Sequence, residues 1–185
     1  FLCAFIKVPT CVAGENTMKK AIIILLAAVM GTCSKPPTAL DEILDSGVLR
    51  VITRNSPTTY YRGAIDYEGP EYMLIRGFRN FLSTKYNKPL QLDIETADRF
   101  GEIFPAIESG RSHIAAAGLT ITDERQQRVA FGPTYQEVKQ SLIYKLGSGK
   151  PRNLAQLYGK RLEVISGSSY VETLNDIQDQ HPDLS

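Results

Sequence analysis

Apolar residues along the first two thirds of the chain switch repeatedly between helical spacing and strand alternation. Leu40, Ile43 and Leu44 share one face of a helix, and Gly47 ends it before a β-branched run at 48–53. The pattern also predicts a helix capped by Asp98 and ended by Gly110, a helix at 71–86, and strands at 90–95, 112–117 and 140–145. Helices that alternate with strands favour an α/β fold with parallel strand pairs.

A stretch rich in glycine, with a proline, at 146–151 separates this region from a second one. Beyond it the pattern predicts a short helix, a strand at 160–165 and a further helix. One strand and its following helix cannot cover both faces of a parallel sheet. We therefore expect a near-complete lobe 1 at 40–145, a hinge at 146–151 and an incomplete lobe 2 at 152–185, in a chain that is a fragment.

Residues 18–33 have the pattern of an export signal. A pair of lysines and a short apolar run follow Met18, and the run is shorter than a membrane span. Small residues before Cys33 predict a lipoprotein signal with lipidation of that cysteine, and an ordinary secretory signal or a retained anchor are the alternatives. We interpret residues 1–17 as an upstream extension from a misplaced gene start, and 34–39 as a short tether.

Composition removes several classes of function. The net charge is +1, which gives no basic patch for nucleic acid. The three cysteines all lie within the first 33 residues, and the two histidines, His113 and His181, are far apart, so no metal-ligand spacing is present. We expect neither a metal nor a cofactor, and no nucleic-acid partner.

The stretch AAAGLTITDERQQ at 115–127 changes abruptly from small apolar to charged residues. Arg125, beside two acidic residues, has a plain interpretation as a surface ion pair worth ~0–1 kcal/mol. Its other interpretation is an anion trap at the end of a strand. Asp123, with Gln126 three residues later, predicts a helix N-cap. We interpret His113, in the preceding strand, as a solvent-facing residue.

Several motifs occur in the order found in a known protein family. They are GVLRV (47–51), IFPAI (103–107), GLTITDER (118–125), FGPTY (131–135), LAQLYGK (154–160) and GSS (167–169). With these motifs, the chain from about 40 to 180 resembles the bacterial extracellular solute-binding proteins of family 3. The resemblance implies an α/β, periplasmic-binding-protein-like bilobal fold whose two lobes close on a ligand in the cleft.

The resemblance also implies a ligand site. The expected ligand-binding residues are Arg125, Thr120, Gly118, Phe100, Tyr60, Ser168 and Ser169. Arg125 stands where amino-acid-binding relatives grip the ligand carboxylate, with Thr120 bonding the same group and Gly118 offering only backbone in place of the usual serine. Phe100 matches an aromatic that stacks on the ligand, and Tyr60 or Tyr61 matches the opposing wall. The two serines match lobe 2 residues that close over the carboxylate. Core packing of Phe100 and helix capping by the serines are the alternative interpretations.

Within the family, the stretches RNSPTTYY (54–61), AAGLT (116–120) and GPTY (132–135) look most like the N-terminal part of membrane-bound peptidoglycan lyases. In those enzymes a solute-binding-like domain precedes a lysozyme-like catalytic domain, and no such catalytic domain occurs in this chain. The implied function is regulatory. The domain would bind an amino acid or cell-wall peptide, reach peptidoglycan through the parent enzyme, and lie lipid-anchored at the periplasmic face of the outer membrane of a Gram-negative bacterium.

Other functions on the same scaffold stay open. One is a periplasmic amino-acid-binding protein of an ABC transporter, and another is an enzyme like the cyclohexadienyl dehydratases. A soluble periplasmic protein is the alternative to the lipid-anchored one. A full-length gene that encodes no lysozyme-like domain would argue against the regulatory interpretation.

Overall fold

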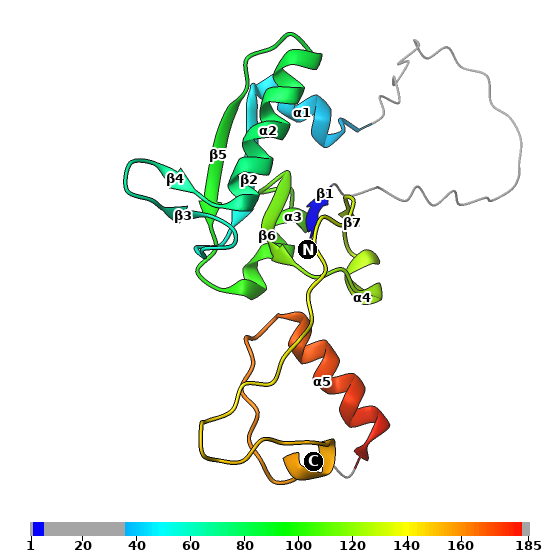
Figure 1. The fold of residues 1–185 in the computed structure, drawn as a ribbon. Coiled ribbons are helices and arrows are strands. Elements are labelled where there is room, and N and C mark those ends of the chain that lie inside the picture. The colour runs from blue at the N-terminus through cyan, green and yellow to red at the C-terminus, as the bar shows by residue number, and fades with distance from the viewer. Residues whose placement is uncertain (1, 6–35, 183–185) are drawn as a thin grey trace, which may run out of the picture.

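The computed structural model describes residues 2–5 and 36–182 of the chain (Figure 1). The strands are β1 (Leu2–Phe5), β2 (Val48–Thr53), β3 (Tyr61–Arg62), β4 (Tyr67–Glu68), β5 (Gln91–Thr96), β6 (Ile114–Leu119) and β7 (Ala130–Phe131). The helices are α1 (Ala39–Ser46), α2 (Pro70–Lys85), α3 (Ile103–Glu108), α4 (Asp123–Gln126) and α5 (Ser169–Gln180), with 3₁₀ turns η1 (Phe100–Glu102) and η2 (Leu154–Leu157). Across these residues, every helix is too short or too polar to span a bilayer. The predicted signal and Cys33 lie outside the described residues.

The main sheet has the strand order β5-β2-β6-β1-β7. β2 is parallel to both β5 and β6, so that Val51 pairs with Ile94 on one side and Ile114 on the other. These parallel pairs, joined through helices, confirm the predicted α/β class. β1 is antiparallel to both of its neighbours and separates β6 from β7, although it belongs to the segment 1–17 that the sequence pattern assigns to an upstream extension.

Helices cover both faces of this sheet, with α1 and α2 on one face and α3 on the other (Figure 1). Alternation along the strands divides the core in two. In β2, Val51 packs with the α1 and α2 side, and Ile52 packs with α3. In β6, Ile114 packs with the α1 and α2 side, and Ala115 packs with α3. Because the period of a strand is two, both faces of a strand must be apolar when both are covered.

Local sequence explains where the helices begin and end. The side chain of Thr38 accepts the N–H of Asp41, and the Asp41 carboxylate accepts the N–H of Thr38. These two hydrogen bonds form a capping box that starts α1. Gly47 ends α1 with φ of 72°, a left-handed conformation that glycine adopts without a steric penalty. Pro105 lies in the first turn of α3, where its missing N–H has no helical acceptor, so the helix starts at Ile103 and not near Asp98.

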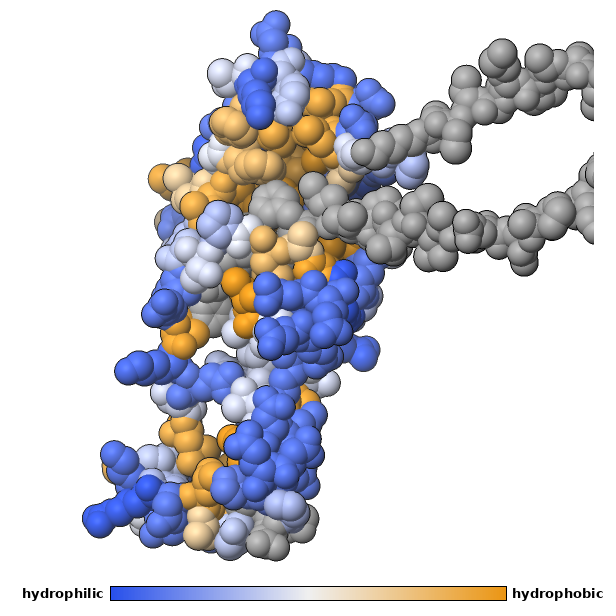
Figure 2. Space-filling model, turned by 90° about the vertical axis from the view of Figure 1, so that its right-hand side faces the viewer, coloured by the Kyte–Doolittle hydropathy of each residue, from blue (hydrophilic) through white to orange (hydrophobic). Residues whose placement is uncertain are grey.

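Two predicted strands are absent from the described chain, and this is a correction. Residues 140–145 and 160–165 form neither helix nor strand, are exposed, and do not pair with another strand there. Alternating apolar residues form a strand only when a neighbour satisfies their N–H and C=O groups. Ile143, in the first of these segments, is 92% exposed, and Leu146, which follows that segment, is 95% exposed. Figure 2 shows apolar side chains on the surface of this lower part of the molecule, which is hollowed where it meets the sheet.

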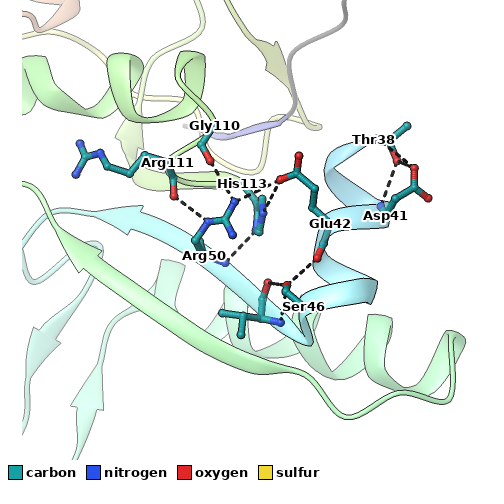
Figure 3. Close-up of polar contacts among 9 residues, drawn as sticks. Thr38, Asp41, Glu42, Ser46, Arg50, Gly110, Arg111 and His113 are labelled. Carbon is teal, nitrogen blue, oxygen red and sulfur yellow. Dashed lines mark hydrogen bonds and ion pairs between the residues drawn. The ribbon is translucent and has the colours of Figure 1, made fainter. Parts of the chain in front are cut away.

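His113 is buried, which corrects its interpretation as a solvent-facing residue. Its Nδ1 accepts the backbone N–H of Arg50, and its Nε2 lies 3.5 Å from a carboxylate oxygen of Glu42 (Figure 3). Burial, followed by the nearby Arg50 guanidinium, holds the pKa of His113 below its usual range, and Glu42 opposes that shift. The cluster therefore joins α1 to β2 and to the start of β6, away from the cavity described below.

Candidate ligand-binding site

A cavity of about 290 Å³ lies between the carboxyl end of β6 and the start of α5. The two surfaces come from regions separated by the exposed segment 132–167. The sequence-predicted residues that line the cavity are Phe100, Gly118, Thr120, Ser168 and Ser169. Five of the seven residues expected in the ligand site are thus brought together, three from the sheet region and two from the start of α5.

Glu71 is a cavity residue that the sequence analysis missed. It lies in the first turn of α2, is 1% exposed, and accepts the backbone N–H of Gly118 with both carboxylate oxygens, at 2.9 and 3.1 Å. The hydroxyl of Tyr135 donates to the same carboxylate. Burial raises the pKa of Glu71, and these two hydrogen bonds oppose the rise. The only sequence signal was an acid in a first turn, which is explained equally well by the helix dipole.

Gly118 has the conformation that this arrangement needs. Its φ is +65°, a left-handed value that a residue with a side chain adopts only at an energetic cost. The bend turns its N–H towards Glu71, so the backbone donor that the resemblance assigns to the ligand already has a partner. The glycine in place of the family's usual serine is therefore explained by the backbone conformation.

Thr120 and Ser169 connect the two sides of the cavity directly. The Ser169 hydroxyl donates to the Thr120 hydroxyl oxygen at 3.1 Å, across 49 positions of sequence. Ser168 is the N-cap residue of α5, and its hydroxyl donates to the Ile165 carbonyl in place of capping the helix. The side chains of both serines thus face neighbours other than the N–H groups of α5, contrary to the simple capping interpretation.

Arg125 lies next to the cavity but does not line it. Its side chain is buried, and its Nε donates to Glu172 of α5 at 2.7 Å. Its two terminal nitrogens donate to the carbonyls of Thr120 and Gly167, and its guanidinium lies 5.0 Å from the centre of the Phe104 ring. The surface-pair interpretation does not fit a side chain that is 3% exposed. The carboxylate that binds Arg125 in this structure is therefore the side chain of Glu172, a residue of the chain.

The helix that presents Arg125 is capped by Thr122, which corrects the prediction for Asp123. The Thr122 side chain accepts the N–H of Arg125 at 3.3 Å, and Asp123 is the first residue inside the helix. Threonine is a good N-cap, and an acid in the first turn is favoured by the helix dipole. The sequence therefore predicted the N-cap of α4 one residue too late.

Tyr60 lies away from this cavity. Its ring stacks on Tyr67 with 4.5 Å between centroids and meets the edge of Tyr72 at 5.3 Å. Burial is the main cause that raises its pKa to about 12. The tyrosine belongs to an aromatic cluster beneath the β3–β4 hairpin, and the opposing wall of the cavity is formed by other residues.

Two cations line the cavity that were not among the expected residues. Arg54 follows β2 directly, and its guanidinium carbon lies 5.7 Å from the centre of the Phe100 ring. Lys139 comes from the exposed segment beyond β7. The side chain of Phe100 also packs against the α3 core, so its packing and cavity interpretations both apply. No group of three or more His, Cys, Asp or Glu side chains suited to a metal occurs in the residues described.

Comparison with known proteins gives a consistent result. Residues 49–183 match the bacterial extracellular solute-binding proteins, family 3. The chain is 38% identical over 164 residues to membrane-bound lytic murein transglycosylase F of Saccharophagus degradans, and 37% over 171 residues to the protein of that name from Stutzerimonas stutzeri. These alignments cover 89% and 90% of this chain but 32% and 34% of the relatives, so the chain spans about a third of their length.

Solved structures agree on the fold. An ancestral arginine-binding protein bound to arginine matches 72% of this chain and 57% of its own, with 27% identity and a TM-score of 0.59. An arginine-binding protein variant from T. maritima matches 75% of this chain and 58% of its own, with 22% identity and a TM-score of 0.60. With the matched region covering most of its length, this chain belongs to the bacterial extracellular solute-binding proteins of family 3.

Proposed function

We propose that this domain binds a small amino acid or a cell-wall peptide in its central cavity and regulates an attached peptidoglycan lyase. The observation that carries the proposal is the cavity itself, which collects five expected ligand residues from two separate parts of the chain. The relatives named as lytic murein transglycosylases support the attached activity, and the arginine-bound neighbour supports an amino-acid-like ligand.

The two surfaces of the cavity supply a mechanism for regulation. A ligand that contacts Thr120 on one surface and Ser169 on the other binds the closed arrangement more tightly than an open one, and so shifts the population towards closure. Coupling between this shift and the lyase is a free energy shared by two sites, commonly 1–3 kcal/mol. Arg125 joins the ligand site when a ligand carboxylate displaces Glu172 from its guanidinium.

The location follows from the same proposal. We place the domain in the periplasm of a Gram-negative bacterium, lipid-anchored through Cys33 to the outer membrane. The parent enzyme contacts peptidoglycan and cleaves its glycan chain without hydrolysis, leaving an anhydro sugar. The relatives described as membrane-bound support this placement.

The test uses the full-length gene product and purified peptidoglycan. Release of anhydro sugars is measured with and without a mixture of soluble cell-wall peptides, for the wild type and for Thr120→Ala. We expect the peptides to change the rate at least several-fold in the wild type and far less in the variant. A rate that is unaffected by peptides in the wild type would contradict the regulatory function.

An ABC-transporter binding protein is the second candidate, favoured by the amino-acid-binding neighbour. It predicts tight binding of free amino acids and a gene that continues for one more lobe and then ends. The downstream codons distinguish the two functions directly, because only the first requires a lysozyme-like domain.

A further inference from the structure

Helix α2 carries apolar side chains on its solvent side as well as on its core side. Ile75 and Leu82 are buried in the core, whereas Met73 is 59% exposed, Leu74 48% and Phe81 54%. With about 3.6 residues per turn, the three exposed side chains lie within about 100° of one side of the helix. We call them the α2 strip. Exposed apolar area of this kind is unfavourable in water, so the strip indicates a contact beyond the described chain.

Positive charges border the α2 strip on both sides. By helical spacing, Arg76 lies beyond one edge of the strip and Lys85 beyond the other, and both are exposed. The Nζ atom of Lys85 is 5.5 Å from the centre of the Phe81 ring, so charge and apolar surface adjoin. Glu71 is the only acid in the segment 70–88, and it is 1% exposed. The surface of α2 is therefore apolar and basic, without an exposed acid of its own.

The α2 strip lies on the same face of the sheet as α1, the helix that the predicted tether enters. Leu40 of α1 and Phe78 of α2 pack against one core cluster, and Figure 2 shows apolar side chains gathered on the upper part of the molecule, where these helices lie. In the proposed location, the lipid on Cys33 is five positions before Thr38, the N-cap of α1. Five residues span at most about 18 Å, so the anchor would keep this face near the bilayer.

A bilayer surface matches the chemistry of the α2 strip. Interfacial helices bury apolar side chains at the boundary between headgroups and acyl chains, while lysine and arginine attract anionic headgroups. Lys85 can place its charge at the headgroup level, because its stem lies along the rings of Phe81 and Tyr86. The neighbouring α1 has exposed acids at Asp41, Glu42 and Asp45, so an anionic surface would be met by α2 and not by α1.

We propose that the α2 strip, with Arg76 and Lys85, is a membrane-contact surface that binds anionic phospholipid and holds the domain against the bilayer beside its anchor. The inference rests on the proposed lipid-anchored location and goes beyond it, because it assigns the face of the domain that meets the membrane. None of these residues lines the ligand cavity, so a failure here leaves the proposed ligand binding unaffected.

The experiment is co-sedimentation of protein with phospholipid vesicles. The mature full-length gene product, beginning at Ser34, is used so that neither the predicted signal nor the lipid contributes to binding. Vesicles of phosphatidylcholine alone are compared with vesicles that contain about 30% phosphatidylglycerol, at low and high salt. The variants are Phe81→Ser and the double substitution Arg76→Gln with Lys85→Gln. Ile65→Ser is the control, because Ile65 is 91% exposed and lies between β3 and β4, away from α2.

We expect the wild type and Ile65→Ser to sediment with the anionic vesicles, less at high salt, and only weakly with phosphatidylcholine alone. Phe81→Ser should weaken binding about tenfold through lost apolar burial. The double substitution should weaken it more than about tenfold, since each cation near an anionic surface contributes about fivefold. Thermal melting and light scattering report the folding and the oligomeric state of each variant.

Three results would overturn the inference. The first is a wild type that stays in solution with anionic vesicles or binds both kinds of vesicle equally. The second is a folded Phe81→Ser, or a folded double variant, that binds anionic vesicles as tightly as the wild type. The third is a dimer of the free wild type that Phe81→Ser converts to a monomer, which would assign the α2 strip to a second copy of the chain.

Discussion

Single side chains organise the cavity through hydrogen bonds between residues far apart in sequence. Glu71 and Gly118 are 47 positions apart, and Thr120 and Ser169 are 49 apart. The motif order predicted that Gly118, Thr120 and Ser169 belong to one site, and all three line the cavity. The sequence did not predict Glu71 and Arg54 as cavity residues, because hydrophobic periodicity indicates which face of an element is buried and gives no information on long-range polar partners.

Glu71 gives a pH-dependent prediction. Its raised pKa means that the folded protein holds the proton more tightly than the unfolded chain, whose carboxyl has the ordinary value of 4.5. This contribution to stability is complete below 4.5 and is lost as the pH rises through the folded-state pKa. The wild type should therefore lose stability relative to Glu71→Gln as the pH rises above 4.5.

Urea unfolding of both proteins across this pH range measures the difference. Glu137→Gln, a substitution of the same kind at an exposed position, should show no change in the difference from wild type. A constant difference between the wild type and Glu71→Gln would contradict the role of burial.

His113 predicts the opposite dependence. Its pKa is lowered in the folded protein, so its contribution to stability is complete above the unfolded value of 6.5 and is lost as the pH falls through the folded-state value. The melting temperature of the wild type should fall as the pH falls below 6.5, and His113→Asn should reduce this slope. Asparagine keeps an acceptor for the Arg50 N–H. The exposed His181→Asn serves as the control, and a slope unchanged in His113→Asn would argue against the burial of a neutral imidazole.

At the scale of elements, the sequence predicted the helices and strands from α1 to β5 well and those beyond β7 poorly. α1, β2, α2 and β5 lie within one or two residues of their predicted bounds, because periodicity, capping residues and core burial agree there. The segments at 140–145 and 160–165 have strand composition without a partner strand. Their state depends on neighbours in space, which composition does not report.

The cap of α4 is testable by a pair of substitutions. Thr122→Ala removes the acceptor for the Arg125 N–H and should lower the free energy of unfolding by about 1 kcal/mol. Asp123→Ala removes only a favourable charge in the first turn and should cost less, about 0.3–1 kcal/mol. Chemical denaturation measures both, and a larger loss for Asp123→Ala would restore Asp123 as the cap.

At the scale of the whole molecule, a buried ion pair holds α5 against the sheet region. Arg125 and Glu172 lie on the two sides of the cavity, with side chains 3% and 23% exposed. Together with Ser169 and Thr120, they form a polar contact that closes the molecule through its own groups. The resemblance assigned Arg125 and the two serines to the same ligand carboxylate, but it could not indicate that Glu172 of the chain would bind Arg125.

Glu172→Gln should loosen α5. The substitution leaves the Arg125 charge buried without its carboxylate, a change that costs about 3–5 kcal/mol in a fully buried pair and less here because Glu172 is partly exposed. Hydrogen exchange of the α5 amides should accelerate, while exchange in β2 and β6 stays slow. Asp176→Asn, at an exposed position of the same helix, is the control. Unchanged protection in Glu172→Gln would show that other contacts hold α5.

The two sides of the cavity also meet through backbone, at Gly167 and Gly101. A Cβ placed on Gly167 would come within 2.9 Å of the Gly101 Cα, and Gly167 has φ of 77°. A residue larger than glycine at position 167 would act as a wedge between the two sides, and it would also disturb the bond that the Gly167 carbonyl accepts from Arg125. Because the ligand favours the closed arrangement, such a wedge would weaken closure and ligand binding together, without any substitution in the cavity lining.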